Sequence, residues 1–117
     1  MVVRKKHIED CTQRFVVNYL RNNGIFVFAV PNGGSRKNAL EGYNLKLSGV
    51  MAGVADLIIL LPKRVVFVEM KTPEGRQSDS QKEFEKKVEE LGFEYHIWRS
   101  VDEAVQFVRY NKNILTY

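Results

Sequence analysis

The feature that most constrains the fold is a pair of apolar segments, residues 57–61 and 65–70, separated by Pro62-Lys63-Arg64. Their β-type composition and the short connection with a proline predict a β-hairpin. In the second segment, Val65 and Phe67 face one side and the alternate apolar residues face the other, by the period of two along a strand. Both faces are apolar, so this strand is predicted to be central in its sheet and covered on each side.

Helices and further strands are predicted around the hairpin. Apolar residues recur at helical spacing over residues 7–22, with Gly24 as the stop signal. Two capping-box patterns, Ser78-x-x-Gln81 and Ser100-x-x-Glu103, begin two more amphipathic helices. The segments 25–30 and 93–98 are predicted strands, whereas residues 38–55 fit either a short helix or a strand.

This order of elements predicts an α/β fold. The strand 65–70, the helix from Ser78 and the strand 93–98 form a β-α-β unit, for which parallel strands and a right-handed crossover are expected. The chain then builds a central mixed β-sheet flanked by helices, in the order α-β-β-β-α-β-α. Its length of 117 residues predicts a single domain over residues 1–117, because one core commonly serves about 100–150 residues.

Composition excludes several classes of protein. The lone cysteine, Cys11, rules out a disulfide scaffold and a zinc site with several cysteine ligands. No apolar run approaches the roughly 20 residues that span a membrane, and no secretory apolar segment follows the basic N-terminus. We therefore expect a cytoplasmic protein without a membrane anchor. Its net charge of +4 is compatible with a polyanionic partner without requiring one.

Charged residues gather at one end of the predicted hairpin. If the turn pairs Leu61 with Arg64, Asp56 lies directly opposite Glu69, with about 5 Å between their Cβ atoms. Lys71 follows two residues after Glu69 and therefore shares its face. Like charges directly opposite each other are destabilising unless something neutralises them. Mg²⁺ or Mn²⁺ would do so, because these ions take hard oxygen ligands; the alternative is an ordinary polar fringe where the strands leave the core.

The residues around this cluster resemble a known family. Gly53-Val54-Ala55-Asp56 precedes the hairpin, Glu69-Met70-Lys71-Thr72 ends it, and Gly75-Arg76-x-Ser78-x-x-Gln81-Lys82 follows. Gly92-Phe93-x-Tyr95 and Trp98-Arg99-Ser100 extend the pattern. Together these motifs resemble the VRR-NUC (virus-type replication-repair nuclease) domains of the PD-(D/E)XK nuclease superfamily. One departure is Ala55, where the family usually has proline; that residue shapes the backbone and carries no chemistry.

The resemblance implies a restriction-endonuclease-like core and metal-dependent hydrolysis of phosphodiester bonds. By the same resemblance, Asp56 and Glu69 are expected as metal ligands, with the Met70 carbonyl as a third ligand and Mg²⁺ or Mn²⁺ as the cofactor. Lys71 is expected to orient the attacking water and to stabilise charge on the phosphate. These roles agree with the pairing of Asp56 and Glu69 that the hairpin predicts.

Gln81 and Glu9 each have two interpretations. Gln81 completes the capping box of Ser78, but it also lies three residues before Phe84, on the stripe that faces the sheet. The family places a glutamine here in the active centre. Glu9 lies at the flank of the buried face of the first helix, about 75° from its centre by the 3.6-residue period. It is either a solvated side chain or a further metal ligand, as first-helix glutamates often are in related nucleases.

Five basic residues are candidates for binding DNA phosphates. Such contacts give salt-dependent, mostly sequence-independent binding, and the alternative is a normally charged surface. No helix-turn-helix or zinc-finger pattern is present to read base edges. The candidates are Arg36, Lys37, Lys46, Arg76 and Lys82.

We therefore expect a divalent-metal-dependent DNA endonuclease of the stand-alone type typical of phages and bacteria. The family suggests structure-selective cutting of branched DNA, such as Holliday junctions, by a homodimer whose two-fold axis suits a symmetric junction. An alternative within enzymes is a nuclease for flap, nicked or single-stranded DNA, or a restriction-like enzyme. From other classes, the rival interpretations are a catalytically silent DNA-binding module and a structural phage protein.

Overall fold

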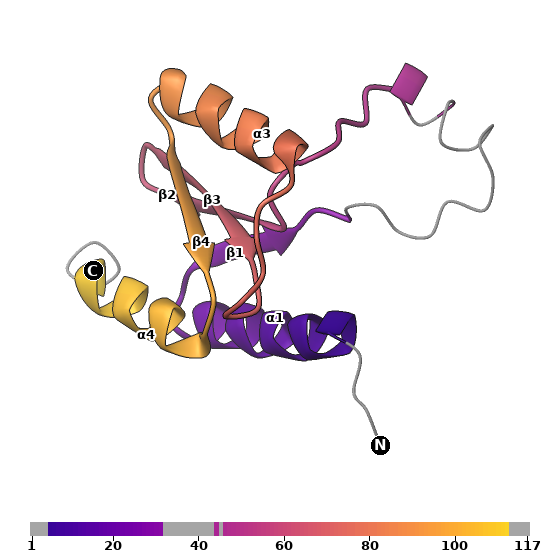
Figure 1. Ribbon diagram of the computed structural model, residues 1–117. Helices are drawn as coiled ribbons and strands as arrows, with labels where there is room; N and C mark the ends of the chain where they lie inside the picture. The colour runs from indigo at the N-terminus through magenta and orange to yellow at the C-terminus, as the bar shows by residue number, and fades with distance from the viewer. Residues whose placement is uncertain (1–4, 32–43, 45, 113–117) are drawn as a thin grey trace.

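The computed structural model describes residues 5–31, 44 and 46–112, with the backbone alone for residues 5–10. Within these residues, four strands form one mixed sheet in the order β1-β2-β3-β4 (Figure 1). Neighbours β1/β2 and β2/β3 are antiparallel, whereas β3/β4 is parallel. This arrangement confirms the predicted hairpin and the parallel pair of the β-α-β unit. The strands are β1 (Phe26–Ala29), β2 (Leu57–Leu61), β3 (Arg64–Met70) and β4 (Glu94–Trp98).

Helices cover both faces of the sheet (Figure 1). Helix α3 (Asp79–Glu90) lies over one face, while α1 (Lys5–Asn22) and α4 (Val101–Tyr110) lie together over the other. Between β1 and β2, residues 44, 46 and 47 are helical. The order of the main elements is the predicted one. Among the described residues, no helix combines the length and hydropathy needed to cross a membrane.

The two faces of β3 belong to two separate apolar clusters, as expected for a central strand. Val66 and Val68 are fully buried in the larger cluster, which also contains residues of α1 and α4. Phe67 packs on the opposite side, in a smaller cluster with Phe84 of α3 and Tyr95 of β4. Burial on both sides explains why residues 65–68 of this strand form a continuous apolar run.

Both predicted helix starts are found, but only one has the predicted capping box. At Ser78 the box is complete, since its hydroxyl accepts the N–H of Gln81 and the Gln81 side chain accepts the N–H of Ser78. At Ser100 the side chain makes no capping hydrogen bond. Instead, Glu103 Oε1 accepts the N–H of Arg99, one residue before the cap, at 3.1 Å. The second capping-box prediction is therefore wrong in its bonding, although the helix begins where expected.

The apolar stripe of α1 is wider than the face it buries. Val16 and Leu20, one turn apart, are fully buried against the sheet. Phe15 belongs to the same stripe but is 56% exposed, and Cys11 is exposed as well. Helical spacing alone does not define the width of the contact, because that depends on how the helix sits against the sheet.

Candidate active site

The register of the hairpin brings Asp56 and Glu69 together as predicted. Leu57 pairs with Val68 and Leu61 with Arg64, so the next position outward places Asp56 opposite Glu69. Asp56 is half-buried, and its Oδ2 accepts the backbone N–H of Met70 at 2.8 Å. Because a charged acceptor strengthens a hydrogen bond, this contact fixes the carboxylate against the end of β3.

Glu69 is the buried member of the pair. It is 3% exposed and lies on the face of β3 that α3 covers. Gln81 Nε2 donates to Glu69 Oε2 at 3.1 Å, while Gln81 Oε1 accepts the N–H of Ser78 at 2.8 Å. Both interpretations of Gln81 are thus compatible: one amide caps α3 and holds the Glu69 carboxylate.

Gly53 explains how the segment before Asp56 reaches α3. Its φ of +84° is a backbone angle that residues with a side chain rarely adopt. A Cβ at this position would overlap the carbonyl of Ser80 and lie 2.8 Å from the backbone nitrogen of Gln81. Only glycine fits, so the glycine of the motif allows the chain that carries Asp56 to pack directly on the first turn of α3.

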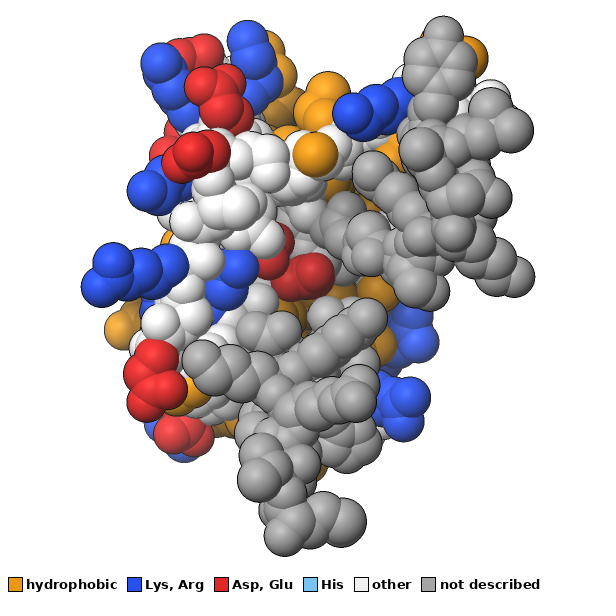
Figure 2. Space-filling model, turned by 45° about the vertical axis from the view of Figure 1, so that its right-hand side comes forward, with side chains coloured by type: hydrophobic (Ala, Val, Ile, Leu, Met, Phe, Trp, Pro, Cys, Tyr) orange, Lys and Arg blue, Asp and Glu red, His pale blue; other side chains and the backbone are white. Residues whose placement is uncertain are grey.

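Lys71 follows β3 on the same side of the sheet as Glu69, by the alternation of the strand. It is half-buried, and its N–H donates to the Trp98 carbonyl at 2.9 Å, which extends the β3–β4 pairing by one step. Figure 2 shows acidic side chains at the centre of one face of the molecule, with a basic side chain beside them.

Gln77, Glu85 and Tyr95 form a hydrogen-bonded cluster near the two carboxylates that the sequence did not predict. Gln77 Nε2 donates to Glu85 Oε1 at 3.0 Å and to the Tyr95 hydroxyl at 3.3 Å. Burial raises the pKa of Tyr95 to about 12, against a lowering by the hydrogen bond from Gln77. The negative charges of Glu69, Glu85 and Asp56 contribute further to the rise.

With its pKa raised, the Tyr95 hydroxyl keeps its proton at neutral pH. The side chain lies close enough to both candidate ligands for their charges to contribute to this rise. Tyr95 pairs with Phe67 across β3 and β4, so its side chain lies on the face of the sheet that α3 covers. The bond to Gln77 carried no sequence signal, because it joins a loop to a strand 18 residues away.

The donor set at this end of the hairpin fits a hard divalent cation. Asp56 and Glu69 supply carboxylate oxygens, and the Met70 carbonyl belongs to the same strand end. Mg²⁺ commonly takes one or two protein carboxylates and keeps several waters. Among residues 11–31, 44 and 46–112, no group of three or more His, Cys, Asp and Glu side chains is positioned to hold a metal. Glu9 belongs to α1, where the structure describes its backbone but not its side chain.

The basic candidates are spread over three parts of the chain. Arg76 is exposed in the connection between β3 and α3, and Lys82 is exposed on the first turns of α3. Lys46 is exposed in the segment between β1 and β2. Arg36 and Lys37 lie outside the described residues. Arg76 and Lys82 therefore flank the start of α3, where Gln81 contacts Glu69.

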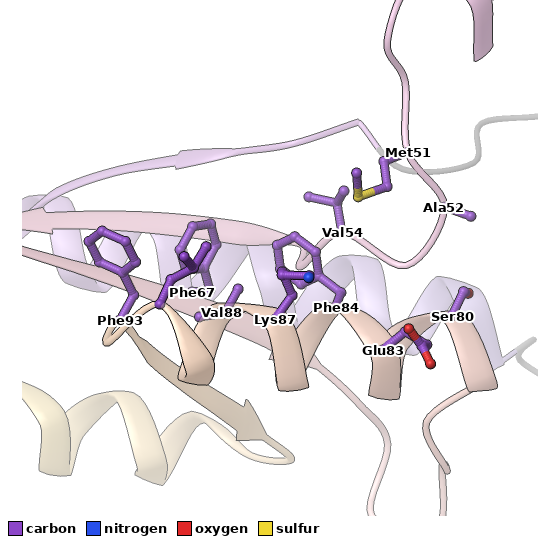
Figure 3. Close-up of a pocket in the computed structure, with 11 residues that line it drawn as sticks. Met51, Ala52, Val54, Phe67, Ser80, Glu83, Phe84, Lys87, Val88 and Phe93 are labelled. Atoms are coloured by element: carbon purple, nitrogen blue, oxygen red, sulfur yellow. The ribbon is translucent and has the colours of Figure 1, made fainter.

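An apolar groove lies along α3 (Figure 3). It has a volume of about 630 Å³ and runs between α3 and the segment that carries Met51 and Val54. Phe67 and Phe84 form part of its wall. Neither Asp56 nor Glu69 lines it, so the groove is separate from the candidate site.

An aspartate lies before β2 and a Glu-x-Lys at the end of β3, as the resemblance to the PD-(D/E)XK class of nucleases predicts. Within that class, the model of the VRR-NUC domain matches residues 27–102. This chain belongs to the VRR-NUC family. Family membership makes it a nuclease of the PD-(D/E)XK type, and such nucleases generally use divalent metals.

Solved structures agree with the family. A structure described as a VRR_NUC domain protein matches with a TM-score of 0.72 at 19% identity, over 97% of this chain and 93% of the other. A second, described as a VRR_NUC domain, matches with a TM-score of 0.63 at 16% identity, over 86% of this chain and 94% of the other. At these identities the likeness supports the fold. A comparison with curated proteins found no match.

Proposed function

We propose that this nuclease cuts DNA internally with the help of Mg²⁺ or Mn²⁺, acting as a homodimer on branched DNA such as Holliday junctions. The observation that carries the proposal is the site at the end of the hairpin. Asp56 lies opposite the buried Glu69, and Lys71 follows on the same face. A buried carboxylate beside a second carboxylate is costly unless a cation offsets their charge.

In this proposal Asp56, Glu69 and the Met70 carbonyl hold the cation, with Glu9 as a further candidate ligand. A bound divalent cation supplies a water of lowered pKa and stabilises negative charge on the phosphate. The Met70 N–H keeps Asp56 in place, and Gln81 keeps Glu69 in place. Both contacts orient the ligands before substrate arrives, which lowers the cost of organising the site during the reaction.

Lys71 acts on the reacting phosphate. Its ammonium orients the attacking water and stabilises the extra charge of the pentacovalent transition state. This charge exists only transiently, so the lysine contributes mainly to the rate and little to the affinity for DNA.

The proposed DNA contacts are to phosphates. Arg76 and Lys82 flank the start of α3, Lys46 lies in the preceding segment, and Arg36 and Lys37 complete the set. Such contacts position the duplex without reading its bases, so selectivity comes from DNA shape. A two-fold symmetric dimer would present two sites to the symmetric arms of a junction.

A panel of labelled substrates tests the proposal. A four-way junction, a flap, a nicked duplex and a single strand are incubated with Mg²⁺, Mn²⁺ or EDTA. We expect internal cuts in the junction with either metal and none with EDTA. Preferential cutting of another substrate would replace the junction while keeping the chemistry. DNA binding without cutting of any substrate would favour the silent DNA-binding module and contradict the proposal.

A further inference from the structure

A tight turn directly follows Lys71. The N–H of Gly75 donates to the Thr72 carbonyl at 3.1 Å, which closes a β-turn with Pro73 at its second position. A Cβ added to Gly75 would lie 3.0 Å from Thr72 Oγ1 and 3.5 Å from Lys71 Cδ. The turn therefore folds back against the aliphatic stem of Lys71 and forms part of its wall.

The guanidinium of Arg99 binds this turn. Arg99 Nη1 donates to the carbonyls of Thr72 at 2.8 Å and Gly75 at 2.6 Å. It also donates to the Pro73 carbonyl at 3.3 Å. Three carbonyls of one four-residue turn thus converge on one charged nitrogen. Hydrogen bonds from a charged donor are stronger than neutral ones, so this contact determines where the turn lies.

The backbone of Arg99 is itself anchored beside Lys71. Met70 pairs with Trp98, and the Lys71 N–H donates to the Trp98 carbonyl at 2.9 Å, so Arg99 occupies the position next to Lys71 across β3 and β4. Glu103 of α4 accepts the Arg99 N–H at 3.1 Å. The backbone of Arg99 is thus held at the end of β4, and its side chain extends to the turn 72–75.

We propose that Arg99 is a positioning residue of the nuclease: it holds the turn 72–75 against Lys71 and so sets the position of the lysine ammonium. The inference rests on the proposed role of Lys71 in cleavage. Reaction rates depend steeply on geometry, and a misplacement of about 1 Å can cost about 100-fold. Without the guanidinium, the three carbonyls turn to water and the wall beside Lys71 loosens.

The test separates chemistry from DNA binding. The rate of single-turnover cleavage is measured at saturating enzyme with Mn²⁺, and the dissociation constant and its salt dependence are measured in EDTA. For Arg99→Ala we expect a rate about 10- to 100-fold lower, with a dissociation constant within about twofold of wild type and an unchanged salt slope. Arg99→Lys keeps the charge, but its nitrogen lies one bond nearer the backbone and reaches the three carbonyls less well, so we expect an intermediate rate. Arg109→Ala, which removes an exposed arginine of α4, is the matched control and should match wild type on every measure.

Each other outcome overturns the inference. Weaker DNA binding with a salt slope reduced by about one, and an unchanged rate for the bound complex, would make Arg99 a phosphate contact. An unchanged cleavage rate and an unchanged affinity for DNA would show that Arg99 only stabilises the fold. If Arg99→Ala is unfolded at the assay temperature, Arg99→Lys decides, and a wild-type rate in that variant contradicts the inference.

Failure of the proposed function is recognised separately. A wild-type protein that does not cleave, or a Lys71→Ala variant that cleaves normally, removes the proposed mechanism itself. Normal cleavage by Arg99→Ala, in a protein whose Lys71→Ala variant is inactive, removes only the role of Arg99.

Discussion

Gln81 shows how closely folding and the candidate chemistry are joined at single residues. The same amide accepts the N–H of Ser78, which starts α3, and donates to Glu69, a candidate metal ligand. A helix start is thereby coupled to the orientation of a carboxylate. Pattern alone could not separate these two roles, because the same glutamine three residues after the serine serves both.

Replacing Lys71 by alanine should abolish cutting while leaving DNA bound. We expect the cleavage rate to fall at least about 100-fold, as for loss of one group that stabilises transition-state charge, with an affinity for junction DNA within a few-fold of wild type. Single-turnover cleavage and gel-shift titration measure the two quantities. Lys63→Ala removes the same charge at the other end of the hairpin and is the control. Cleavage by Lys71→Ala at the wild-type rate would end the proposed role of the lysine.

Replacing Gly53 by alanine should destabilise the protein more than the left-handed backbone alone explains. Gly53 and Gly92 have similar φ values, +84° and +88°, but a Cβ at Gly92 meets nothing within 4 Å. Gly53→Ala and the comparison variant Gly92→Ala both carry the cost of about 1–2 kcal/mol for a side chain in left-handed backbone. Gly53→Ala adds an overlap with the backbone of α3, for which we expect about 1–3 kcal/mol more.

Urea unfolding of the two glycine variants isolates this extra cost. The difference between their free energies of unfolding reports the close approach of Gly53 to α3. Equal values for the two variants would show that the segment before Asp56 does not pack tightly on α3.

At the scale of elements, the hairpin was the part most open to prediction. Its two apolar segments and short turn predict the strands, and the register in which Leu61 pairs with Arg64 brings Asp56 opposite Glu69. Contacts that cross between elements left no such pattern. Tyr95 with Gln77, and Arg99 with the turn 72–75, join residues far apart in the sequence, so their partners depend on how the elements pack.

A second polar group ties the opposite end of the hairpin to the rest of the fold. Arg64 binds Glu94 through two nitrogens, at 2.7 and 2.8 Å, and donates to Asn111 Oδ1 at 2.7 Å. The hydrogen bonds and charge of Arg64 hold the pKa of Glu94 below its usual value, with smaller contributions from His96. One arginine thus joins β3, β4 and the end of α4.

The stabilisation by Arg64 should depend on pH. Because the pKa of Glu94 is lowered on folding, its contribution is present above the unfolded pKa of about 4.3 and is lost as the pH falls through the folded value. We expect Arg64→Ala to cost about 1–3 kcal/mol at pH 7, including the loss of the partner of the buried Asn111, and less at pH 3.

Urea unfolding at both pH values measures the effect of Arg64. Arg109→Ala serves as the control for removing a positive charge, and its effect should change little between the two pH values. A cost of Arg64→Ala that is as large at pH 3 as at pH 7 would contradict the role assigned to the Glu94 carboxylate.

For the whole molecule, the net charge of +4 understates the attraction to DNA in the proposed function. Asp56 and Glu69 count against this total, and a bound cation would offset them. The face that carries the site would then be more positive than the sequence total implies. DNA affinity should therefore depend on both metal and salt.

The homodimer is a prediction about the whole molecule. Light scattering after size exclusion should give a mass near twice 13.6 kDa at micromolar concentration. Two sites in one particle would let both strands of a symmetric junction be cut in one encounter. A strict monomer under these conditions, with or without junction DNA, would contradict the proposed homodimer.

Calorimetric titration with Mn²⁺ measures whether Asp56 and Glu69 hold a divalent cation, on which the proposed function depends. Asp56→Asn keeps an acceptor for the Met70 N–H while removing the charge, and Asp102→Asn removes an exposed carboxylate of α4 as the control. We predict Mn²⁺ binding by wild type and Asp102→Asn, and an affinity at least about tenfold weaker in Asp56→Asn. Equal Mn²⁺ affinity in Asp56→Asn and wild type would show that Asp56 is not a ligand of the cation.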